Sequence, residues 1–226
     1  MTDKNTVQAN NEIKAKINRV FAGYFNTKSD GKFKIENIKK KQTDFKNILF
    51  SRMNNKNIVK YTLKDISEDT LTGLQHRNLN KIKGEFLLKG KDLLVMDVIK
   101  SKKELENTCD FKKRLLENND VILRIKGKVG PAVLVNKDIQ GLYYYNDIVK
   151  IRVDTDKVLP QYLSLYLNSM LGEYYLKRNT KAKSMNYITI RSLKKIPILA
   201  PMLANQWKII QRYHKLKNIK KEEEIN

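Results

Sequence analysis

The chain has 226 residues, of which 41% are hydrophobic and 8% aromatic, so it can bury a core and is not a disordered polyelectrolyte. Its 46 basic and 24 acidic residues give a net charge of +22. This excess predicts a polyanionic partner. Nucleic acid fits better than a membrane surface, because the charges are spread along the whole chain rather than gathered on one amphipathic helix.

Cysteine, histidine and the N-terminal residues narrow the class of protein further. Cys109 is the only cysteine, which excludes an internal disulfide and fits a reducing compartment. His76 and His214 lie far apart and without cysteine neighbours, so no metal site is expected. The N-terminus has no apolar signal region, and no window approaches a membrane span. The sequence therefore predicts a soluble, unexported, cytoplasmic protein without metal or cofactor.

The first 50 residues contain one clear helical pattern. Apolar residues in 5–25 recur on one face of a 3.6-residue period, namely Ile13, Ile17, Val20, Phe21 and Tyr24. Gly23 and the polar run after it end this helix. The sparser apolar pattern of residues 33–50 predicts a short helix or a connecting segment.

Strand patterns begin at Ile58. Residues 58–67 alternate and predict a strand with Val59, Tyr61 and Leu63 on one face, followed by a glycine-bearing loop over 67–80. Residues 84–100 predict one or two strands, split at Lys89–Lys91. The charged segment 101–118 is helix-prone and leads into the next strands.

A strand, a turn and a second strand are predicted over 121–135. Gly127 and Gly130 flank a short turn and permit a positive φ there. A plain hairpin is the better explanation of the two glycines, although they also allow the backbone to approach a phosphate. The basic residues Arg124, Lys126 and Lys128 add weight to this second interpretation.

Further elements follow to the C-terminus. Residues 143–153 predict a third strand, and residues 159–178 a single helix with Pro160 in its first turn and an apolar stripe facing the core. Residues 179–189 predict a lysine-bearing loop, in which cations are interleaved with aromatic and amide side chains. Such a mixture suits phosphate and base-edge contacts, although a solvated loop is the alternative. Residues 205–224 predict a second amphipathic helix, with apolar positions at Ile209, Tyr213, Leu216 and Ile219.

The order of these pieces resembles the target recognition domain of the specificity subunit of type I restriction–modification systems. The resemblance rests on the turn Gly127–Gly130, the helix around Gln161–Ser169, and Leu193–Pro197 running through Pro201 to Gln206. It implies an α+β fold in which a mixed β-sheet recognition domain is flanked by N- and C-terminal amphipathic helices. The implied units are a helical segment at 1–50, the recognition domain at 51–202 and a helical spacer at 203–226.

With one recognition unit, the chain resembles a half-length specificity subunit. The implied partners are double-stranded DNA, an adenine methyltransferase (the modification subunit), a restriction subunit and a second copy of the chain in a homodimer, with no membrane partner. Two departures weaken the homodimer: Ala204 and Asn205 stand where the family has an acidic pair before the glutamine, and the last helix is short.

The terminal helices carry the docking residues in this interpretation. Their apolar faces are expected to contact each other, a twin chain or a modification subunit. Charged substitutions at Ile209 and Leu216 are then expected to weaken assembly while the recognition domain stays folded. The docking residues are Ile13, Ile17, Val20, Phe21, Ile209, Tyr213, Leu216 and Ile219.

The chain lacks the sequence motifs of a DNA-modifying or DNA-cleaving enzyme. Its four prolines lie in GPA, LPQ, IPI and APM, so neither an Asn/Asp-Pro-Pro-aromatic methyltransferase loop nor the Pro-Asp of a common nuclease motif is present. Glu12-Ile13-Lys14 spells Glu-x-Lys by chance in a lysine-rich helix. We therefore expect a binding protein without catalytic residues.

Three functions stay open from the sequence alone: a DNA specificity subunit that directs a methyltransferase, a free-standing DNA-binding regulator or interference protein built on the same domain, and a general RNA-binding protein. For DNA, phosphate contacts are expected from Lys126, Lys128, Lys177, Arg178 and Lys181, and base contacts from Arg77, Asn78, Asn186 and Tyr187. Arg124 and Lys183 complete the predicted DNA-binding set.

Overall fold

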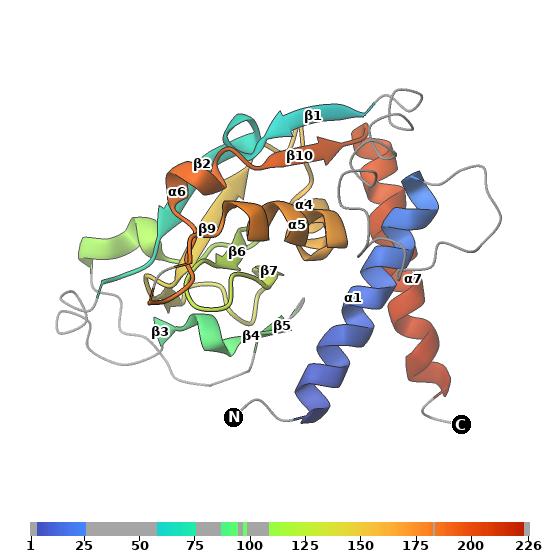
Figure 1. Ribbon diagram of the computed structural model, residues 1–226, viewed down its shortest axis with the longest axis horizontal. Helices are drawn as coiled ribbons and strands as arrows, with labels where there is room; N and C mark the ends of the chain where they lie inside the picture. The colour runs from blue at the N-terminus through green and yellow to red at the C-terminus, as the bar shows by residue number, and fades with distance from the viewer. Residues whose placement is uncertain are drawn as a thin grey trace.

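The computed structural model describes residues 4–25, 58–75, 87–94, 97–98, 109–182 and 184–223 (Figure 1). Helices and mainly antiparallel strands alternate in an α+β fold, as predicted. The layers run from a small β-sheet region through a pair of central helices to two long terminal helices (Figure 1). Among the described helices, none is long and apolar enough to cross a membrane.

The largest sheet has four strands in the order β2-β9-β6-β7: Ser67–Thr72, Ile148–Val153, Val121–Arg124 and Ala132–Leu134. Alternation along β9 sends Val149, Ile151 and Val153 to the main hydrophobic core. Ile148 faces a second, smaller core on the other side, where Leu88, Leu116 and Tyr144 lie. The sheet is therefore buried on both faces.

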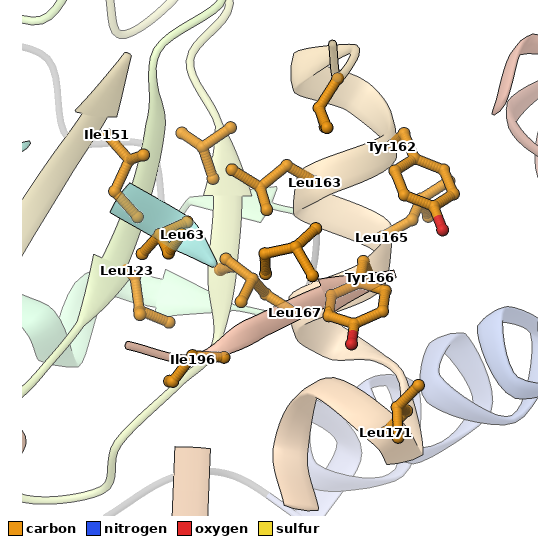
Figure 2. Packing of buried hydrophobic residues seen from close by; sticks show 14 of the residues in the cluster. Leu63, Leu123, Ile151, Tyr162, Leu163, Leu165, Tyr166, Leu167, Leu171 and Ile196 are labelled. Atoms are coloured by element: carbon orange, nitrogen blue, oxygen red, sulfur yellow. The ribbon is translucent and has the colours of Figure 1, made fainter. Parts of the chain in front are cut away.

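Helix α4 (Pro160–Asn168) covers the main-core face of the sheet. Figure 2 shows Leu163 and Leu167 on the sheet side of this helix, and Tyr162 and Tyr166 on the opposite side. The two tyrosine rings lie 5.8 and 6.2 Å from that of Phe21 in the N-terminal helix. Because both faces of α4 are buried, its apolar stripe is a packing feature, as predicted.

The predicted helix 159–178 is two helices, which is a correction. Ser169 separates α4 from α5 (Met170–Asn179), and its hydroxyl accepts a hydrogen bond from Gly172 N at 3.2 Å. A Cβ at Gly172 would stand only 2.1 Å from the carbonyl oxygen of Tyr166. The close approach of the two helices therefore needs glycine at this position, and the apolar periodicity could not show the break.

The predicted strand 58–67 also divides. It forms β1 (Val59–Thr62) and a 3-10 turn, η1 (Leu63–Ile66), and β2 then occupies part of the predicted loop. Thr62 and Asp65 cap the turn reciprocally, with Thr62 N donating to Asp65 Oδ2 at 2.7 Å. The turn buries Leu63, whereas Val59, expected on the same face, is exposed. β1 pairs with β10 (Pro197–Ala200), which follows the one-turn helix α6 (Ile190–Leu193).

The predicted strand 143–153 is likewise two strands. β8 (Tyr143–Tyr144) pairs in parallel with β3 (Leu87–Leu88), and a turn in which Ile148 N donates to Tyr145 O precedes β9. The predicted 84–100 strands appear as β3, a 3-10 turn η3 (Gly90–Asp92), β4 (Leu93–Leu94) and β5 (Asp97–Val98). Of the segment 101–118, the described part contains the 3-10 helix η4 (Cys109–Arg114). Residues 33–50 lie outside the described residues.

The terminal helices are α1 (Lys4–Phe25) and α7 (Leu203–Glu223), as the periodicity predicts. They lie side by side, with the start of α1 and the end of α7 at the same end of the pair (Figure 1). Gln206, at the start of α7, fixes the helix: its side chain donates to Pro201 O at 2.8 Å and to Lys157 O at 3.0 Å, and accepts from Leu159 N at 2.9 Å.

The apolar faces of these helices lie inside the chain's own main core. The sequence left open whether these faces contact each other, a twin chain or a modification subunit. In the structure the two faces contact each other and also pack on α4. Ile219 has a side chain outside the described set. The buried residues are Ile17, Val20, Phe21, Ile209 and Tyr213, with Ile13 and Leu216 partly buried against them. The main core is continuous from α1 through the sheet to α7, and the division at residues 50 and 202 stays a prediction.

Candidate nucleic-acid interface

The predicted hairpin around the two glycines is present. β6 and β7 pair antiparallel, with Val121 opposite Leu134, and both Gly127 and Gly130 have positive φ values, of 73° and 82°. The turn closes on itself, since Gly130 N donates to Arg124 O at 2.8 Å. Residues 124–130, which we call the glycine turn, therefore project from one end of the central sheet as a defined structure.

A second segment lies directly against this turn. In residues 181–187, which we call the basic loop, Lys181 and Tyr187 exchange two backbone hydrogen bonds of 2.8 and 3.0 Å. Tyr187 also forms an antiparallel bridge with Lys126. Segments some 60 positions apart in the sequence thus meet through their main chains.

Two further backbone bonds complete the junction. Gly127 N donates to Asn186 O at 2.8 Å, and Ile188 N donates to Ile125 O at 3.0 Å. The basic loop is therefore an extra edge on the glycine turn, held by main-chain bonds on both sides of Tyr187. Side chains of the two segments share one surface as a consequence.

Most of the predicted DNA-binding residues that the structure describes lie at this junction. Lys128, Lys181 and Asn186 are exposed, and Lys126 and Tyr187 are half-buried. Cations beside an amide and a phenol provide donors for phosphates and donors and acceptors for base edges. The arrangement can thus hold a backbone and present polar groups to a groove.

Lys177 and Arg178 lie one turn before the basic loop, in the last turn of α5. Both are exposed, and Arg178 Nη1 donates to Tyr174 Oη at 3.2 Å. Cations in the last turn also complement the negative end of the helix dipole, so their position has a structural reason as well. Their predicted phosphate contacts stay a prediction.

Arg124 has a role within the turn that the sequence did not show. Its Nε donates to Lys126 O at 3.0 Å, and a Cβ placed at Gly127 would come within 2.8 Å of its Nη2. The guanidinium therefore packs inside the bend and supports its shape. A DNA contact through its other N–H groups stays a prediction.

Three predicted residues, Arg77, Asn78 and Lys183, lie outside the described residues. The chain before Arg77 is described as far as Gln75: β2 ends beside the glycine-turn end of β9, with Thr72 opposite Val149, and Leu74 bridges to Tyr145. The same end of β9 pairs Ile148 with Arg124.

Asp147 and Met185 are residues at this end of the sheet that the sequence reasoning missed. Asp147 joins the first residue of η3 to the glycine turn, because its carboxylate accepts from Gly90 N at 2.9 Å and its carbonyl accepts from Ile125 N at 2.8 Å. Met185 in the basic loop has 51% of its surface exposed. An apolar residue within a polar loop was the signal available for Met185, whereas nothing local marks Asp147.

Within the described part of the chain, no group of three His, Cys, Asp or Glu side chains is placed to hold a metal ion. The buried charges near the sheet belong instead to a structural network of Asp120, Lys150 and Arg152. The chemistry at the glycine turn and the basic loop is thus that of hydrogen-bond donors, acceptors and positive charge.

Comparisons with known proteins agree on one family. Residues 33–226 match the family described as Type I restriction modification DNA specificity domain. The chain is 28% identical over 108 residues to the type I restriction enzyme StySPI specificity subunit of Salmonella potsdam, a stretch covering 45% of this chain and 23% of that protein. It is 22% identical over 117 residues to the EcoBI specificity subunit of Escherichia coli, covering 52% and 24%.

Solved structures show the same fold. A chain from a study of complex assembly and conformational transition of the type I R-M system gives a TM-score of 0.59 at 14% identity, covering 94% of this chain and 46% of that one. The HsdS subunit from Thermoanaerobacter tengcongensis gives a TM-score of 0.52 at 13% identity, covering 95% and 45%. The chain thus matches about a quarter of the curated relatives' length and under half of these solved chains. Because the family match extends over residues 33–226, the chain belongs to the family of type I restriction–modification DNA specificity domains.

Proposed function

We propose that the chain recognises one sequence in double-stranded DNA and directs a separate adenine methyltransferase, the modification subunit, to it. In a complete system the same recognition would also direct a restriction subunit that translocates and cleaves DNA. Family membership supports DNA recognition and a non-enzymatic role. The observation that carries the proposal is the main-chain junction between the glycine turn and the basic loop, which gathers cations, an amide and a phenol on one surface.

The two kinds of side chain on this surface would do different work. Lys126, Lys128 and Lys181 meet phosphates, which sets register and contributes affinity for any sequence. Asn186 and Tyr187 reach base edges, which contributes affinity for the correct sequence alone. The net charge of +22 favours rapid approach to DNA in the same way for all sequences.

The predicted docking residues do not identify the partner-binding surface. Ile17, Val20 and Ile209 are buried inside the chain, so we assign none of the contacts with the modification subunit, the restriction subunit or a second copy of the chain to their faces. Assembly with these partners would use a surface other than these buried faces.

A salt titration tests the separation of roles. The full chain is first used to select its target from randomised duplexes, and affinity is then measured on target and scrambled duplexes at several salt concentrations. Changing Lys128 to alanine should weaken both duplexes alike and flatten the slope of log affinity against log salt by about one unit, because one phosphate contact and its counterion release are lost. Changing Asn186 to alanine should cost about 1–3 kcal/mol on the target alone.

Lys137 provides the matched control. It is an exposed lysine in the turn after β7, away from the glycine turn along the hairpin, so its change to alanine should leave the salt slope nearly intact. If Lys128→Ala instead removes discrimination with an unchanged slope, the two roles are inverted. If neither Lys128→Ala nor Asn186→Ala differs from the control, this surface does not bind DNA.

A further inference from the structure

Met185 is an apolar side chain placed where the proposed DNA surface is most polar. Five large hydrophobic residues of the described chain are exposed: Val7, Val59, Met185, Met202 and Trp207. Of these, Val7 lies on α1, Val59 on β1, Met202 directly before α7 and Trp207 near the start of α7. Met185 lies in the basic loop, between the exposed residues Ser184 and Asn186.

The main chain around Met185 is fixed although its side chain is exposed. The residue directly after it, Asn186, accepts the hydrogen bond from Gly127 N, and the loop is closed by the two bonds between Lys181 and Tyr187. Arg124 supports the partner side of this junction through its bond to Lys126 O. Much of the ordering cost of a contact at the loop tip is therefore already met in the free protein, which favours binding through that tip.

The neighbours of Met185 limit what it can meet. Lys126 forms the bridge to the loop, and Lys181 closes the loop, so phosphates on this surface would bring the tip toward the edges of the bases. Along the major-groove edge, each base pair presents its own set of hydrogen-bond donors and acceptors, and the C5-methyl group of thymine is the apolar feature. A flexible, polarisable thioether side chain is suited to cover such a methyl group.

We propose that Met185 is a specificity-determining residue that reads a thymine of the target through its C5-methyl group in the major groove. The proposal rests on the proposed DNA-recognition function and names one contact within it. It differs from the polar contacts assigned to Asn186 and Tyr187, because it distinguishes thymine from bases without a methyl group rather than by hydrogen bonding.

Removing one methyl group from the DNA tests this contact. Wild-type chain is used to select its target from randomised duplexes, and each thymine of the target, on either strand, is then replaced in turn by 2′-deoxyuridine. One position should show an affinity loss of about fourfold, the effect of withdrawing one buried methyl group. Met185→Ala should bind the thymine and deoxyuridine duplexes equally at that position, whereas Met185→Leu should keep most of the preference.

Met202→Ala is the matched control, since Met202 is as exposed as Met185 but precedes α7. It should show the wild-type preference at every thymine. The inference is overturned if no thymine of the target is sensitive to loss of its methyl group, if the target contains no A·T pair, or if Met185→Ala keeps the wild-type preference. It is also overturned if Met185→Ala lowers the affinity for the thymine and the deoxyuridine duplex by the same factor and abolishes a bend of the DNA. That result is the behaviour of a wedge between base steps. If the wild-type chain selects no sequence at all, the proposed function itself fails, which distinguishes the two failures.

Discussion

Replacing Ile209 by aspartate is expected to unfold the whole chain rather than only to release a partner. The Ile209 side chain is 2% exposed and shares the main core with Ile17 of α1 and Tyr162 of α4. Loss of such a side chain costs about 2–5 kcal/mol, and a buried carboxylate without a partner costs more. A natural domain is stable by only about 5–15 kcal/mol. Urea denaturation followed by circular dichroism, at equal protein concentrations, measures the loss.

This expectation replaces the one drawn from the sequence, in which charges at Ile209 and Leu216 weaken assembly and leave the recognition domain folded. Leu216 is partly buried against the same core, so Leu216→Asp should destabilise less. Gln211 is exposed on the same helix, so Gln211→Asp is the control and should be close to neutral. A normal urea midpoint for Ile209→Asp, combined with a lower mass in light scattering, would show that Ile209 faces a partner after all.

Replacing Asp120 by alanine should have the second large effect. Asp120 is 1% exposed, and its carboxylate accepts from Arg152 Nε at 2.9 Å and from Glu117 N at 2.8 Å. Lys150, also 1% exposed, places its Nζ 3.8 Å from Asp120 Oδ2 while donating to Lys113 O and Leu115 O at 2.9 and 3.0 Å. Removing the carboxylate leaves a buried cation without its counter-charge, so we expect a loss of about 3–5 kcal/mol in unfolding free energy.

The pH dependence of this loss identifies its cause. Burial lowers the pKa of Lys150 below its usual value, and the charge of Asp120 opposes that shift. Between the lowered and the usual pKa, the unfolded chain binds more protons than the folded chain, so stability rises with pH across this window. Without Asp120 the pKa of Lys150 in the folded chain falls further, and the window in which stability rises with pH extends to lower pH. The difference in unfolding free energy between Asp120→Ala and wild type should therefore narrow as the pH rises.

Glu117→Ala is the matched control for Asp120→Ala. Glu117 also binds Arg152, at 2.9 Å, but its side chain is 59% exposed, so its loss should cost less than about 1 kcal/mol. Urea denaturation at two or more pH values compares the three proteins. Equal losses for the two variants, or a loss for Asp120→Ala that does not change with pH, would contradict a buried charge network.

Local patterns predicted the terminal helices from their sustained apolar period, and the hairpin of β6 and β7 from two short β-branched runs around a pair of glycines. The divisions at η1, at Ser169 and before β9 were missed for a common reason. They depend on the Thr62–Asp65 cap, on the close approach of Gly172 to Tyr166, and on the pairing of β8 with β3, and none of these changes the apolar pattern. Tertiary contacts therefore decided where the elements end.

The sequence predicted which residues belong to the candidate site, but not the backbone contacts that bring them together. Lys126, Lys128 and Asn186 are polar residues in loops, and composition alone drew attention to them. Their common surface depends on backbone bonds such as Gly127 N to Asn186 O, which side-chain identity does not encode. For the same reason the packing of Arg124 inside the turn was not visible, although its basic charge was.

The most direct test of the central claim is the adenine methylation pattern of a genome. The chain and a candidate adenine methyltransferase from the same genome are expressed together in a host without other adenine methylation, and modified bases are read by single-molecule sequencing. We predict methylation at one sequence motif when both proteins are present and none when either is absent, with the motif altered or lost in Asn186→Ala. Adenine methylation by the chain without the methyltransferase, or a motif that is the same without the chain, would contradict a non-catalytic DNA-recognition role.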